Sequence, residues 1–157
     1  MKTSIVTFLI TFCFYLSAYA QASQDKAAEL KEQALSSLKQ KDYIKARYLF
    51  KKAYEAFAAR ENYPQAIECG IQANALYVRE NFYKEGFELC RDMEQFIWTG
   101  EQKQKKVFYD LRFPISKERL QMYIALKNPA QAKNQLDKLE EMAKLAKNDS
   151  LMEVLLY

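Results

Sequence analysis

The stretch that decides the fold is YIKARYLFKKAYEAF, which runs from Tyr43 to Phe57. Its apolar and small residues follow one another in steps of 3, 4, 3 and 4, so they share one stripe of a helix. These positions are Tyr43, Ala46, Phe50, Ala53 and Phe57. The spacing predicts an amphipathic helix with this stripe in the core.

The same spacing occurs twice more in the chain. It returns 40 residues later, and again 46 residues further on, with a small residue at the second position of every copy. The later copies are Tyr83, Gly86, Cys90, Met93 and Ile97, then Pro129, Ala132, Leu136, Leu139 and Ala143. Repetition at this interval indicates stacked helical units, in which a surface rather than a single active site carries the function.

Capping signals divide the chain into helices. Asp42, Asn62 and Asn128 each stand where a side chain can cap a following helix, and Thr99-Gly100 is typical of a helix end. The expected helices cover about residues 25–39, 43–60, 62–80, 82–98, 101–127, 129–147 and 149–157. With no strand pattern and only three glycines, we predict an all-α fold.

Pro114 falls inside the fifth expected helix, where a proline removes a backbone donor and clashes with the preceding turn. We therefore expect a kink or a break around Phe113. Trp98 stands next to the Thr99-Gly100 turn, and we expect it to pack at an edge rather than to form a platform for a ligand.

The N-terminus has the features of a secretory signal peptide. Lys2 precedes the mostly apolar, uncharged run Ile5–Leu16, and Ala18 and Ala20 form the small-x-small pattern of a cleavage site. We expect cleavage after Ala20, with the domain at residues 21–157 exported to the periplasm or secreted; the alternative is an N-terminal membrane anchor, for which the run is short. We expect no membrane span after the signal peptide.

Charge and composition exclude several functions. Residues 21–157 hold 23 Lys and Arg against 20 Asp and Glu, a net charge of +3 that is too balanced to indicate nucleic-acid binding. The chain has no histidine, so histidine-dependent triads, metal ligands and phosphoacceptors are excluded. Paired carboxylates such as Glu140-Glu141 alternate with lysine or arginine, as on solvated helix faces. We expect no enzyme, no metal and no cofactor.

Several positions resemble the tetratricopeptide repeat. Ser37, Tyr77 and Tyr123 each lie nine residues before the small position of a stripe, and Lys41–Ala46 (KDYIKA) is the closest single match. Ala34, Phe50 and Ala53 also fit the family pattern. The resemblance implies a solenoid of three helical hairpins, at about residues 25–60, 62–98 and 101–147, with a lone helix at 149–157.

The chain departs from the family in its second and third hairpins. Gly86 and Cys90 stand in place of an alanine and an aromatic residue, Asn74 and Leu120 stand where a small residue is usual, and the spacings of 40 and 46 residues exceed the family's usual length of about 34. A HEAT-like or other α-hairpin solenoid is therefore the alternative fold.

The family uses its concave groove, lined by the first helix of each hairpin, to bind a peptide or protein segment. The resemblance places twelve residues in that groove: Lys31, Leu35, Leu38, Lys39, Glu68, Ile71, Ala75, Val78, Arg79, Lys117, Gln121 and Ile124. Leu38, Val78 and Ile124 are the expected apolar anchors. Lys31, Arg79 and Lys117 are expected to orient the bound segment.

As a whole, the chain is also similar to the periplasmic N-terminal segment of Gram-negative membrane signalling proteins, in which such repeats precede a histidine kinase or a helix-turn-helix output domain. The alternative function is thus the sensory part of a signal-transduction protein. An exported enzyme is the third class considered.

Cys69 and Cys90 are the candidate disulfide pair, since in a family-like second hairpin they lie at nearly the same height on antiparallel helices. A disulfide needs Cα atoms within about 7 Å, closer than the usual helix spacing of about 8 to 10 Å. Two buried free thiols are the alternative.

Overall fold

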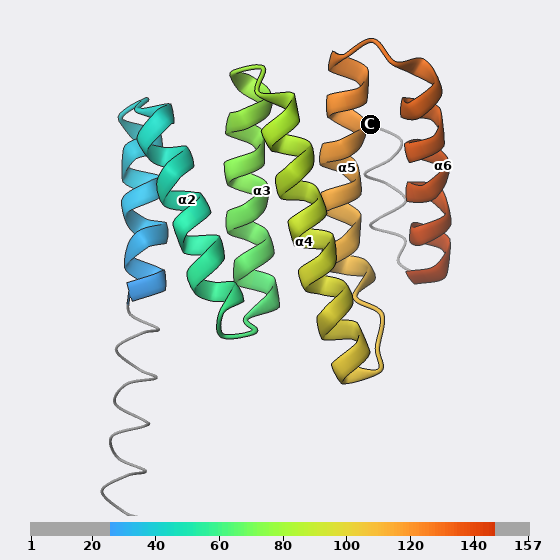
Figure 1. The fold of residues 1–157 in the computed structure, drawn as a ribbon, viewed down its shortest axis with the longest axis horizontal. Coiled ribbons are helices and arrows are strands. Elements are labelled where there is room, and N and C mark those ends of the chain that lie inside the picture. Colours follow the sequence, from blue (N-terminus) through green and yellow to red (C-terminus); the bar gives the residue numbers. More distant parts are fainter. Residues whose placement is uncertain (1–25, 147–157) are drawn as a thin grey trace, which may run out of the picture.

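The computed structural model describes residues 26–146, and every regular element within that range is helical (Figure 1). The all-α prediction is confirmed for these residues. The expected signal peptide at 1–20 and the lone helix at 149–157 lie outside the described part of the chain. A helix over residues 26–39 is followed by α2 (Tyr43–Ala58), α3 (Tyr63–Arg79), α4 (Tyr83–Gln104), α5 (Tyr109–Ala125) and α6 (Pro129–Ala146).

The predicted caps form as expected. The side-chain oxygen of Asp42 accepts a hydrogen bond from the backbone N–H of Lys45 at 3.1 Å. Asn62 and Asn128 do the same for the third residue after each of them, at 3.4 and 3.2 Å. Each cap satisfies a backbone donor that the first turn of a helix leaves unpaired.

One turn recurs at the start of all five connections between the described helices. In each case a residue with positive φ precedes a backbone N–H that donates to a carbonyl five residues earlier, which is the geometry of a Schellman turn. The positive-φ residues are Lys41, Glu61, Asn81, Lys105 and Lys127. The hydrogen bonds run from Asp42 to Ser37, Asn62 to Phe57, Phe82 to Tyr77, Lys106 to Glu101 and Asn128 to Tyr123. The first three turns are 20 residues apart, so the chain repeats in structure as well as in sequence.

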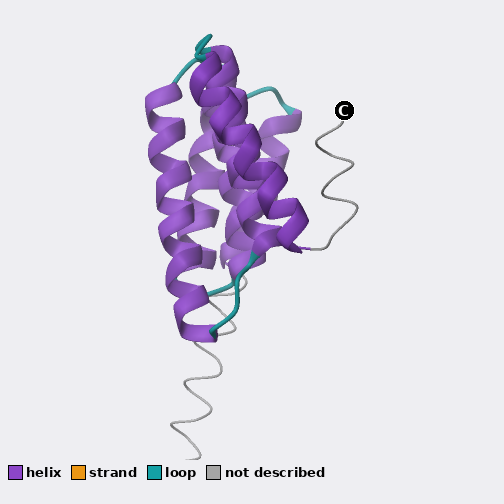
Figure 2. Ribbon diagram, turned by 90° about the vertical axis from the view of Figure 1, so that its right-hand side faces the viewer, coloured by secondary structure: helices purple, strands orange, loops and turns teal. Residues whose placement is uncertain are grey.

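The helices succeed one another across the molecule in chain order (Figure 1), and short loops join them at the two ends (Figure 2). From α2 onward each helix packs against the next, and α3 also packs against α5. Neighbours in the sequence are therefore neighbours in space.

The apolar stripes form the core. All of the first stripe except the partly buried Tyr43 is buried, and in the second stripe only Tyr83 is partly exposed. In the third, Leu139 and Ala143 are buried whereas Pro129 and Leu136 are exposed. The third stripe is less covered because, among the described helices, α6 packs closely only against α5.

The predicted boundary between the fourth and fifth helices is wrong. Thr99 and Gly100 do not end α4, which continues to Gln104 and stops where Lys105 adopts a left-handed conformation (φ 52°). Glu101, expected to open the next helix, is buried in the last turns of α4. The expected break at Phe113 is also absent, because α5 runs through Pro114 without interruption.

Gly100 is needed for close packing rather than for a turn. It is buried inside α4, and a Cβ at this position would lie 2.5 Å from Cζ and 2.7 Å from Oη of Tyr63. The Tyr63 ring cannot easily move, since it stacks on Phe96 with centroids 4.6 Å apart and packs on Phe108 at 5.4 Å. A side chain at position 100 therefore has no room.

We expect Gly100→Ala to lower the free energy of unfolding by about 1 kcal/mol, because the clash outweighs the better helix propensity of alanine. In a Tyr63→Leu background, which removes the clash, the same substitution should stabilise the protein by up to about 1 kcal/mol. Urea unfolding of the four proteins tests this coupling. Equal effects in both backgrounds would show that Tyr63 does not restrict position 100.

Candidate functional site

All twelve residues predicted to line the binding groove are exposed or partly exposed in the structure. They lie on three helices: the 26–39 helix, α3 and α5. We call this set the first-helix face. α3 packs against α5, so their contributions to the face are adjacent.

Lys31 and Glu68, two residues of the first-helix face, join the 26–39 helix to α3. Nζ of Lys31 lies 2.7 Å from Oε1 of Glu68 and donates a hydrogen bond to Oε1 of Gln65 at 2.9 Å. Lys31 thus already has partners within the chain. Its expected role in orienting a bound segment is weakened accordingly.

The other predicted cations have different surroundings. The guanidinium of Arg79 lies 3.7 Å from the centre of the Tyr43 ring, where it is held by a cation–π contact. Lys117 forms no ion pair with another described residue. Among the apolar anchors, Leu38 and Val78 pack partly against the core, whereas Ile124 is 62% exposed. Ile124 also lines an open pocket, together with Lys127 and Pro129.

The sequence did not predict a second feature, a groove between α4 and α6 with α5 as its floor. We call it the α4–α6 groove; its cavity volume is about 610 Å³, within the range of ligand sites. Trp98, which we expected to pack at an edge, is 51% exposed and lines it. The other lining residues used below are Arg91, Glu94, Val107, Arg112, Ser116, Arg119, Gln135, Lys138, Met142 and Leu145.

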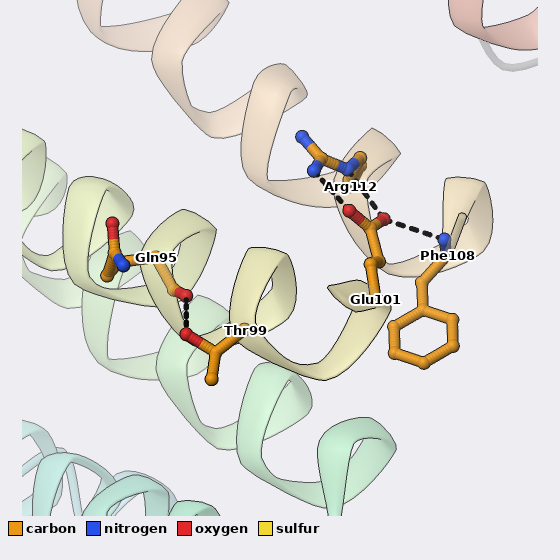
Figure 3. A network of polar contacts seen from close by, with 5 residues as sticks. All are labelled: Gln95, Thr99, Glu101, Phe108 and Arg112. Carbon is orange, nitrogen blue, oxygen red and sulfur yellow. Dashed lines mark hydrogen bonds and ion pairs between the residues drawn. The ribbon is translucent and has the colours of Figure 1, made fainter. Parts of the chain in front are cut away.

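A polar network fixes one end of this groove (Figure 3). The buried carboxylate of Glu101 accepts hydrogen bonds from Nε of Arg112 at 2.7 Å and from the backbone N–H of Phe108 at 2.8 Å, and it also pairs with Nη2 of Arg112. Burial opposes its ionisation, but the bonds from Arg112 and Phe108 outweigh burial and lower the pKa of Glu101. The network ties the end of α4 to the start of α5.

A second buried polar contact joins α3 to α5. Nδ2 of Asn74 donates to Oε2 of Glu118 at 2.9 Å, and both residues are buried. Oδ1 of Asn74 is buried without a hydrogen-bond partner. Burial raises the pKa of Glu118, with the Asn74 hydrogen bond and the charge of Lys117 opposing it.

Cys69 and Cys90 are both buried, and both are free thiols in the structure. Burial raises the pKa of each thiol to about 12. Such thiols are poor nucleophiles, because the reactive form is the thiolate. The structure therefore favours their action as small core residues.

Residues 26–146 contain no cluster of three or more aspartate, glutamate or cysteine side chains placed to hold a metal ion. None of the helices in that range combines the length and apolarity needed to cross a bilayer.

Comparison of the chain with protein-family models, curated proteins and solved structures finds no match. The candidate function therefore depends on the geometry of the two surfaces.

Proposed function

We propose that this chain is an exported, non-catalytic interaction scaffold of TPR-like helical hairpins that binds a peptide or protein segment along the first-helix face. The observation that carries the proposal is the exposure of all twelve positions of that face, on three helices whose opposite sides form the core. A helical repeat leaves such a face free because each unit packs mainly on its neighbours.

The recurring turn supports the same proposal. It sets successive helices in the same relation to each other at residues 37–42, 57–62 and 77–82. Equivalent positions therefore return on one side of the molecule, which is how repeat proteins build an extended surface from short helices.

Binding would combine apolar contact with charge. Leu38, Val78 and Ile124 present apolar surface on successive first helices, and Ile124 is the most exposed of them. Arg79 and Lys117 can pair with carboxylates of the bound segment, since neither forms an ion pair with another described residue. Lys31, already paired with Glu68, contributes less.

The test uses peptides selected from a random display library on the wild-type protein. We expect Arg79→Gln with Lys117→Gln to weaken binding of face-directed peptides about tenfold, because two cations are lost from the contact. The unfolding free energy should change by less than about 1 kcal/mol, since both side chains are at the surface.

The matched control is Lys45→Gln with Lys84→Gln, which removes two exposed lysines from the second helices α2 and α4. It should leave the same affinities unchanged. If no selected peptide distinguishes the two double variants, the first-helix face is not the binding surface.

A further inference from the structure

The α4–α6 groove has a defined direction, because the ion pairs between α4 and α5 fix their antiparallel register. Glu94 pairs with Arg119 at 2.9 Å, and Glu101 pairs with Arg112. The two partners on α4 are seven residues apart, and so are the two partners on α5, in the opposite order along the chain. The groove follows α4 from Arg91 to Trp98, about 10 Å at the helical rise of 1.5 Å per residue.

One end of the groove is cationic. Arg91 on α4, Arg119 on α5 and Lys138 on α6 lie at this end with the carboxylate of Glu94, and a second carboxylate, Glu141, lines the groove one turn after Lys138. Burial raises the pKa of Glu94, although Arg119, Arg112 and Lys138 act in the opposite direction. Glu94 pairs with Arg119, whereas Arg91 and Lys138 form no ion pair with another described residue.

The other end is apolar. Three exposed apolar side chains line it: Trp98 on α4, Val107 in the loop before α5 and Leu145 near the end of α6. Their exposed fractions are 51%, 46% and 56%. Met142 extends the apolar surface into the groove.

The floor supplies polar groups that the described chain does not use. Ser116 and Gln135 are each 7% exposed and line the groove, and neither side chain forms a hydrogen bond with another described residue. The polar atoms of Ser116 and Gln135 are not among the buried side-chain atoms that lack a partner, so these two residues add polar lining to the groove.

The groove is separate from the first-helix face. The α5 residues that line the groove are Arg112, Ser116 and Arg119. The α5 residues of the first-helix face lie five positions after each of these, at Lys117, Gln121 and Ile124. Five residues turn a helix by about 140° beyond a full turn, which places the two sets on nearly opposite sides of α5.

We propose that the α4–α6 groove is a second docking site, and that its occupant is a segment of a partner protein carrying a carboxylate and an apolar side chain about 10 Å apart. The carboxylate binds at Arg91 and Lys138, beside the Glu94–Arg119 ion pair. The apolar side chain packs on Trp98, Val107 and Leu145. A segment fits better than a small carboxylate, because the complementary charge and the apolar surface lie at opposite ends of a groove two helical turns long.

Trp98 is the only tryptophan in the chain, so its fluorescence reports directly on the groove. Peptides from the display library should include a class with Asp or Glu separated from Leu, Phe or Trp, and these peptides should shift the Trp98 emission to shorter wavelength. Arg91→Glu with Lys138→Glu should weaken them at least about tenfold. Lys133→Glu, an exposed change on the same helix α6 but outside the groove, should not.

Several results would overturn the proposal: no selected peptide moves the Trp98 emission, the emission shift survives the double charge reversal, or free acetate produces the same shift. Self-association that the double charge reversal abolishes would assign the groove to a second copy of this chain instead. The two sites can be tested separately, because Arg79→Gln with Lys117→Gln leaves the groove residues unchanged. That double variant should lose the face-directed peptides and keep the peptides that shift the Trp98 emission.

Discussion

Replacing Glu101 by alanine is expected to lower the free energy of unfolding by about 3 kcal/mol, the largest effect of any single substitution proposed for this protein. The change leaves the guanidinium of Arg112 and the backbone N–H of Phe108 without their acceptor in a partly buried place. Removing one partner of such a network costs more than the net value of its bonds, because the remaining groups stay desolvated. Urea unfolding at pH 7 measures the loss.

The adjacent exposed residue provides the control, since Gln102→Ala should change stability by less than about 0.5 kcal/mol. The effect of Glu101→Ala should also depend on pH. Because the pKa of Glu101 is lowered in the folded state, its contribution is complete above the unfolded pKa of about 4.5 and disappears as the pH falls through the folded pKa. An effect that is small at pH 7 would mean that the network does not hold α4 to α5.

Replacing Glu118 by glutamine is expected to raise stability by about 1–3 kcal/mol at pH 8. Asn74 donates one hydrogen bond to Glu118, but its own Oδ1 has no donor. A glutamine amide can accept from Nδ2 of Asn74 and donate to Oδ1 at the same time. The substitution removes a buried charge and satisfies a buried acceptor.

The gain should grow with pH. Burial raises the pKa of Glu118, so its contribution is fully present below the unfolded pKa of about 4.5 and is lost as the pH rises through the folded pKa. The protonated acid can also donate to Asn74, which is why glutamine imitates it. Unfolding from pH 5 to 8 should show wild type and Glu118→Gln diverging, whereas exposed Glu140→Gln should follow wild type. Parallel curves for all three proteins would contradict this account.

Local sequence signals predicted most of the helices correctly. The stripe spacing identified most of the buried residues of α2 and α4, although Leu49, Tyr54 and Leu89 are buried outside the stripes. The caps at Asp42, Asn62 and Asn128 marked helix starts to within a residue. These features depend on residues only a few positions apart, so they can be recognised without knowledge of the rest of the fold. The TPR-like arrangement of the hairpins remains a proposal.

The errors occurred where contacts distant in sequence decide the outcome. Gly100 looks like a helix end by its local preference, but it is the Tyr63 ring, 37 positions earlier, that requires a residue without a side chain. A kink or a break was expected around Pro114. The break is absent, because α5 continues through Pro114, the sixth residue of the helix.

The α4–α6 groove could not be predicted because its residues belong to three helices whose register is set by ion pairs. The one local signal was Trp98, which an edge position would also explain. The twelve residues of the first-helix face came from the resemblance to the tetratricopeptide repeat, and the structure places all of them at exposed or partly exposed positions. The ion pair between Lys31 and Glu68 could not be predicted, because it joins residues of different helices that are far apart in the sequence.

The central claim, that the first-helix face binds a protein segment, is tested most directly by mapping where a selected peptide contacts the protein in solution. Backbone amide shifts of the labelled protein during titration with a face-directed peptide would show this. We predict changes around Leu38, Val78 and Ile124, on the 26–39 helix, α3 and α5. Changes confined to α2, α4 and α6 would contradict the claim.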